Sequence, residues 1–95
     1  MIMTVTVKPA FELGSVFATA NAIATFATET LLACLNRHAA GDWGDLDSED
    51  RQANDMALAT GGRLLSSYTF PGQGKLWAIT EDDRSATTLL HPEDY

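Results

Sequence analysis

The sequence predicts an α+β fold in which two to three short N-terminal helices pack on a C-terminal three-stranded antiparallel meander. In the first two thirds of the chain, helix-capping residues precede apolar residues at helical spacing. After Gly61-Gly62, apolar residues instead recur at every second position, which is the spacing of a strand. A Pro-Gly-Gln-Gly turn at 71–74 separates two alternating runs. The 95 residues suit one small domain. We expect 19–60 to be helical, 63–91 to form the sheet, and 1–10 to be either a short strand or a flexible segment.

Two helices are predicted before residue 41. Thr19 or Asn21 is expected to cap a first short helix, and Thr28 a second helix over 29–39. Gly41 is a natural residue to end it, because the position after a helix favours positive φ. The inward stripe of the second helix is predicted to contain Leu31, Leu35 and His38.

A third helix is predicted over 48–60. Asp47 precedes it as a cap, and Glu49 and Asp50 complement the positive end of the helix dipole in its first turn. Its buried stripe is expected to be Ala53, Met56, Ala57 and Thr60.

Three alternating runs follow and predict the meander. They cover 63–70, 75–80 and 85–90, and tight turns join them. Helices must cover one face of such a sheet, since a small sheet alone cannot bury its apolar side.

Charge is distributed unevenly along the chain. The formal net charge is −7, and all of it lies in 42–95, where eleven carboxylates face four cations. This charge argues against direct binding to nucleic acid or to an anionic membrane surface. The N-terminus has neither the basic nor the apolar region of a signal peptide, and Cys34 is the one cysteine, so we expect a cytoplasmic protein without disulfides.

The acidic loop after Gly41 and a second acidic turn are the predicted binding surface. Trp43 could anchor a protein partner there, or fold back as a lid over a small core. The alternative for the acids is a solvated face that keeps the protein soluble. The candidate interface residues are Asp42, Trp43, Asp45, Asp47, Glu49, Asp50, Glu81, Asp82 and Asp83.

Other chemistry fits the sequence less well. His38, Asp42, Asp45 and Asp47 could bind a divalent metal, but the spacing departs from a calcium loop, and a helix-end role explains His38 better. Cys34 with His38 could form a nucleophile pair, although a buried thiol is the simpler interpretation. Arg84 is expected to pair with Asp82 or Asp83. We therefore predict no catalytic residues, no metal ligands and no cofactor.

Several ordered motifs run through most of the chain. They include Arg37-His38-x-x-Gly41-Asp42-Trp43-Gly44-Asp45-Leu46, Gly61-Gly62-Arg63-Leu64-Leu65-Ser66-x-Tyr68 and Leu76-Trp77-x-Ile79-Thr80-Glu81-x-Asp83-Arg84-Ser85. From about residue 11 onward the chain resembles a family of small bacterial proteins of plasmids and integrated mobile elements. Members often carry the label "plasmid-related protein" or "type I restriction endonuclease subunit M". The second label does not fit, because this chain lacks the length, the glycine-rich cofactor loop and the Asn-Pro-Pro-type motif of a methyltransferase.

The resemblance implies a mobile-element context and supplies no catalytic residues. We expect a non-enzymatic accessory protein that acts through protein–protein contact, with a homodimer as one arrangement. One alternative is an anti-restriction or anti-CRISPR inhibitor whose carboxylates imitate DNA phosphates on a nucleic-acid-binding defence complex. A second alternative is a divalent-metal-binding protein.

Overall fold

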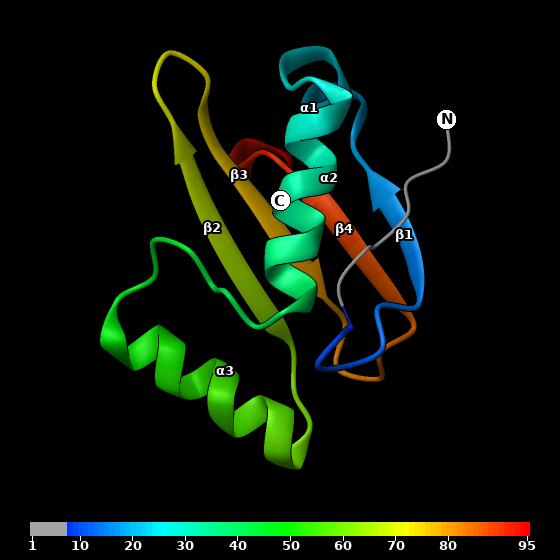
Figure 1. The fold of residues 1–95 in the computed structure, drawn as a ribbon, viewed down its shortest axis with the longest axis vertical. Helices are drawn as coiled ribbons and strands as arrows, with labels where there is room; N and C mark the ends of the chain where they lie inside the picture. Colours follow the sequence, from blue (N-terminus) through cyan, green and yellow to red (C-terminus); the bar gives the residue numbers. More distant parts are fainter. Residues whose placement is uncertain (1–7) are drawn as a thin grey trace.

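The computed structural model describes residues 8–95, which form one mixed sheet with helices on one side (Figure 1). The expected strand near the N-terminus lies mostly outside these residues. Within them, no helix has the length and apolar character needed to cross a membrane. The elements in chain order are β1 (Ser15–Ala18), α1 (Ala20–Thr25), α2 (Thr28–Ala39), α3 (Ser48–Thr60), β2 (Leu64–Phe70), β3 (Gly74–Thr80), β4 (Ala86–Leu90) and the 3-10 helix η1 (Pro92–Asp94).

The sheet has four strands in the order β1-β4-β3-β2. The α+β class and the antiparallel β2-β3-β4 hairpins are confirmed, but the expected helix-first order and three-stranded sheet are wrong. β1 precedes the helices and pairs parallel to β4, with Ser15 opposite Ala86 and Ala18 opposite Leu89. Four residues are too short for a clear alternating pattern, and the partner strand lies near the other end of the chain.

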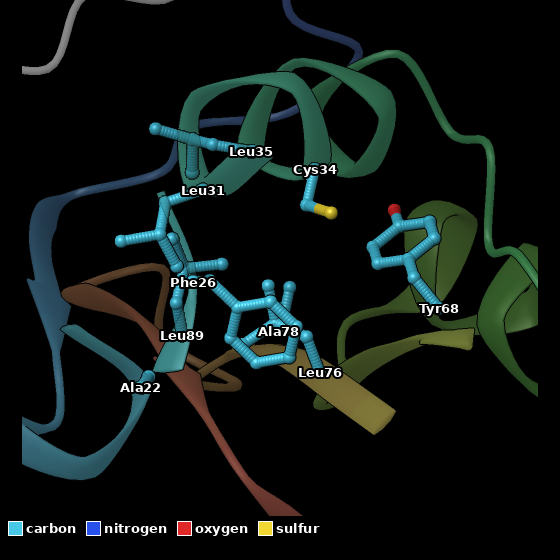
Figure 2. Close-up of a cluster of buried hydrophobic side chains, with 9 residues drawn as sticks. All are labelled: Ala22, Phe26, Leu31, Cys34, Leu35, Tyr68, Leu76, Ala78 and Leu89. Atoms are coloured by element: carbon cyan, nitrogen blue, oxygen red, sulfur yellow. The ribbon is translucent and has the colours of Figure 1, made fainter. Parts of the chain in front are cut away.

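α1 and α2 cover one face of the sheet and form the main core with it. Figure 2 shows the α2 side chains above the sheet, with Cys34 among them and Tyr68 at one side. The predicted Thr19 cap is confirmed, since its side chain accepts the N–H of Ala22. Thr28 is instead the first residue of α2, after an Ala27 cap without a side-chain bond. The buried cluster is Ala22, Phe26, Leu31, Cys34, Leu35, Tyr68, Leu76, Ala78 and Leu89.

α3 lies to the side of this core, next to β2 (Figure 1). Its predicted bounds and Asp47 cap are confirmed. The predicted buried stripe is wrong, because Met56 is 69% exposed and Ala57 is the one member that is buried. The second buried residue is Asn54, whose side chain donates to Leu65 O (2.7 Å) and accepts from Leu65 N (3.1 Å). The Asn54 amide thus provides hydrogen-bond partners for the main-chain N–H and C=O of Leu65 at the edge of β2. This polar contact determines which side of α3 faces inward.

Candidate functional site

The predicted acidic residues lie in two groups at opposite ends of α3. Asp45, Asp47, Glu49 and Asp50 are exposed around its first turn. The second group, 81–83, forms the turn between β3 and β4. A 13-residue helix is about 20 Å long at 1.5 Å per residue, so the acids make a strip and not one compact cluster.

Arg84 joins the second group to α3. Its guanidinium donates to the carbonyl oxygens of Gly62 (2.6 Å) and Ala57 (3.0 Å), at the C-terminal end of the helix. It also donates to Glu81 O at 3.1 Å. The expected pairing of Arg84 with Asp82 or Asp83 is wrong, since main-chain oxygens occupy the guanidinium.

Arg51 also binds main-chain oxygens, at the other end of α3. It donates to Leu46 O (3.0 Å) and Gly44 O (2.9 Å), so it fixes the loop before the helix. In the described part of the chain, Arg37 with Asp42 is the one side-chain ion pair. The other described carboxylates beside α3 therefore form no side-chain ion pair, although Arg51 remains a nearby positive charge.

Asp42 differs from the other candidate acids. Its carboxylate accepts from Arg37 Nε at 2.7 Å and from the Gly44 N–H at 3.1 Å. The hydrogen bond from Arg37 is the largest cause that holds the pKa of Asp42 below its ordinary value. Asp42 consequently stabilises the turn after α2 and has little capacity left for a partner.

Trp43 lies inside the protein and is 6% exposed. Its ring is 6.1 Å from that of Phe11 and 5.8 Å from that of His38, between centroids, and its indole N–H donates to Asp55 Oδ1 at 3.2 Å. It packs with Ala57 and Leu64 in a small second core beneath α3. Trp43 is thus the lid that one interpretation predicted, and it is not available as an exposed anchor.

His38 is buried in a chain of hydroxyl groups. Its Nδ1 lies 2.5 Å from Ser66 Oγ and its Nε2 lies 2.8 Å from Thr80 Oγ1. Thr80 Oγ1 lies 2.7 Å from Thr87 Oγ1, which donates to Leu13 O. The expected contact between His38 and the carbonyls at the end of α2 is wrong, because both ring nitrogens bind the sheet.

The hydrogen-bond chain fixes the tautomer of His38. Thr87 uses its one proton on Leu13 O, so Thr80 must donate to Thr87. Nε2 must therefore carry the imidazole proton and donate to Thr80, and Nδ1 accepts from Ser66. Burial lowers the pKa of His38 to about 4, which keeps the ring neutral near pH 7.

The groups of this buried chain have hydrogen-bond partners and are closed to solvent. Ser66 and His38 are both 0% exposed, so no substrate reaches them in this conformation. Burial also raises the pKa of Cys34 to about 11, and its thiol stays protonated. No group of three or more His, Cys, Asp and Glu side chains within 8–95 is placed to hold a metal ion, and both ring nitrogens of His38 are bound to hydroxyl groups of the sheet.

The polar residues that organise this region were missed by the sequence analysis. Inward positions of three adjacent strands are occupied by Ser66, Thr80 and Thr87. The alternating hydrophobic pattern of a strand predicts apolar side chains at such positions. A buried histidine opposite a sheet needs such partners, so His38 on the predicted inward stripe was the available signal. Asn54 gave no comparable signal.

Comparison with known proteins leaves the family open. No family model, curated protein or solved structure matches this chain.

Proposed function

We propose that this chain is a non-enzymatic binding protein whose acidic α3 surface docks on a positively charged surface of another protein. The acidic α3 surface is defined by Met56 and the carboxylates of Asp45, Asp47, Glu49, Asp50 and Asp55. One observation carries the proposal: Arg51, the cation beside these carboxylates, binds the main-chain oxygens of Gly44 and Leu46 and forms no side-chain ion pair with them. The negative charge is thus left available to a partner.

Exposed apolar side chains support a protein as the partner. Met56 is 69% exposed and Leu58 is 38% exposed on α3, in a helix with Asn54 and Ala57 as its buried residues. Flexible methionine side chains adapt to irregular partner surfaces, and surrounding charges steer the encounter and select the partner. A cationic protein surface with an apolar centre complements this arrangement.

We further propose that the chain is an accessory protein of a mobile genetic element, which its resemblance to plasmid proteins supports. A nucleic-acid-binding defence complex has the cationic groove that the acidic α3 surface fits. In that case the carboxylates would replace DNA phosphates, and the acidic turn at 81–83 would extend the strip beyond the end of α3. Competition between the chain and duplex DNA for the purified partner would distinguish this inhibitor from other accessory proteins.

Affinity capture with matched variants tests the acidic α3 surface. The bait is the wild-type chain, Met56→Ala, or the double variant Glu49→Gln with Asp50→Asn. The control is Glu29→Gln, which removes an exposed acid from the first turn of α2. Retained proteins are identified, purified and titrated against each bait at several salt concentrations.

The proposal expects a partner whose affinity falls with added salt and falls about tenfold in the double variant, because surface charge pairs are screened. Met56→Ala should weaken the same partner, and Glu29→Gln should bind as wild type. Equal affinity for all four baits would overturn the assignment of this surface.

A further inference from the structure

We propose that the β1 edge pairs with the β1 edge of a second copy of the chain, so that two copies share one continuous sheet. The β1 edge consists of the outward-facing N–H and C=O groups of Val16 and Ala18. β1 is the outermost strand of the sheet, and β2 and α3 lie at the opposite edge (Figure 1). The inference is therefore independent of the acidic α3 surface.

Hydrogen bonding to β4 shows which β1 groups face outward. Ser15 N–H donates to Ser85 O and Thr19 N–H donates to Leu89 O, each at 3.0 Å. In a parallel strand pair, alternate residues direct both main-chain groups to the same neighbour. Val16 and Ala18 must consequently direct theirs away from β4, where no other strand lies among residues 8–95.

The two edge strands of the sheet differ in whether their outward main-chain groups have hydrogen-bond partners among residues 8–95. At the β2 edge, Asn54 binds both main-chain groups of Leu65. The main chain of Trp43 and Asp45 binds that of Ser67. Proteins commonly protect exposed edges with short strands, charges, proline or a bulge; β1 is short, but Ser-Val-Phe-Ala contains no charge and no proline. Among residues 8–95, β1 is thus the edge that remains able to accept another strand.

Phe17 adds a side-chain contact to this edge. It is 55% exposed and points to the sheet face opposite Val16 and Ala18, which pack against the main core. The row of paired residues across that face is Phe17, Thr88, Ile79 and Leu65, which carries no charge.

A two-fold axis at Phe17 satisfies all of these groups together. Val16 would exchange two hydrogen bonds with Ala18 of the second copy, and Ala18 two with Val16 of the second copy. Phe17 would then lie opposite Phe17 of the second copy in a non-hydrogen-bonded pair, where side chains are closest and aromatic pairs are favourable. A strand edge is complementary to itself in this antiparallel arrangement, which favours a second copy as the occupant.

The charge distribution is compatible with this dimer. Each chain carries a net charge of −7, but Ser15–Ala18 is neutral. In the joined sheet of eight strands, the two β2 strands would be about 34 Å apart at about 4.8 Å per strand spacing. The acidic α3 surfaces would lie beyond them, at opposite ends, where their repulsion is weak.

Sedimentation velocity over roughly 5–200 µM, a range that brackets a micromolar dissociation constant, tests the dimer. Val16→Pro removes an outward N–H and leaves the bonds of Ser15 and Thr19 to β4, and an edge strand tolerates proline at such a position. Phe17→Ser removes the aromatic pair. Ile23→Ser is the control, because Ile23 is an apolar residue of similar exposure, 52%, on α1.

We expect a wild-type dimer that added salt does not weaken, about tenfold weaker dimerisation for Phe17→Ser, and at least about tenfold for Val16→Pro. Ile23→Ser should dimerise as wild type. In hydrogen exchange, the Val16 and Ala18 amides should be protected at high protein concentration alone, and the Thr19 amide at all concentrations. A wild-type monomer at the highest concentration would overturn the proposal. So would a dimer that Phe17→Ser does not weaken and in which the Val16 and Ala18 amides stay unprotected.

Discussion

α2 and α3 are similar in length but differ in their relation to the sheet. α2 buries five of its 12 residues, including His38, and it lies over the sheet face (Figure 1). α3 buries two of its 13 residues, Asn54 and Ala57. α2 is therefore a core element, whereas α3 is attached through a few polar contacts and displays most of its surface.

This difference indicates where stability resides, and it is consistent with the binding surface that we propose on α3. The α2 side is held by apolar packing, which scales with buried area. The α3 side is held by the Asn54 amide, by Arg84 at its C-terminal end and by the small cluster around Trp43. A helix attached in this way can present Met56 and its carboxylates without support from the core.

The largest expected contrast comes from truncating one apolar residue in each helix. Leu35 is 0% exposed, and Leu35→Ala should lower the free energy of unfolding by about 3–4 kcal/mol through lost burial and a cavity. Met56→Ala should change it by less than about 0.5 kcal/mol. Urea unfolding measures both, and comparable losses would contradict the assignment of α2 as core and α3 as display surface.

Acid should weaken the α2 side through His38. The folded chain lowers the pKa of His38 from 6.5 to about 4, so the unfolded chain binds more protons between these values. The stabilisation is complete above about pH 6.5 and is lost as the pH falls towards 4. The loss reached at pH 4 is about 3 kcal/mol, at about 1.4 kcal/mol per pKa unit with the folded ring half protonated there. Urea titrations between pH 4 and 7.5 measure this loss.

His38→Gln is the control for this pH dependence. It removes the titrating ring, so the slope of stability against pH in this window should become nearly flat, even though the variant is less stable overall. An unchanged slope would assign the effect to other groups. Asp42, Asp83 and Asp94 have lowered pKa values, and their stabilisation is lost only below their ordinary value of 3.8.

The sequence predicted the elements that depend on local signals. The Thr19 and Asp47 caps were recognisable because a capping side chain acts on its own helix. β1 was missed because its formation depends on pairing with β4, near the other end of the chain. The inward face of α3 was missed because Asn54 decides it through Leu65, and a hydrophobic pattern does not count an amide as buried.

The candidate site was predicted in part for the same reason. The acidic composition around α3 was visible directly, but the roles of Arg51 and Arg84 were not. An arginine near carboxylates suggests an ion pair, whereas the fold places free carbonyl oxygens within its reach. The absence of side-chain ion pairs around α3 is thus a property of the folded surface.

Removing the Asn54 amide should loosen α3 alone. Asn54→Ala leaves the Leu65 N–H and C=O without their side-chain partner, which should cost about 1–3 kcal/mol. Hydrogen exchange should become faster at Leu65 and along α3, while the α2 amides stay protected. Gln52→Ala, at an exposed position of the same helix, should leave both unchanged, and equally faster exchange along α2 would show that the two helices unfold together.

The smallest effect is expected at Asp42, which lies between the two regions. The Arg37 and Asp42 side chains are 47% and 50% exposed, so their ion pair is screened, and Asp42→Asn should cost less than about 0.5 kcal/mol. Asparagine keeps an oxygen for the Gly44 N–H. Urea unfolding measures this cost, and titration of the captured partner should show unchanged affinity, because Asp42 already has its partners. A marked loss of partner binding would extend the acidic α3 surface to the end of α2 and weaken the division between a core helix and a display helix.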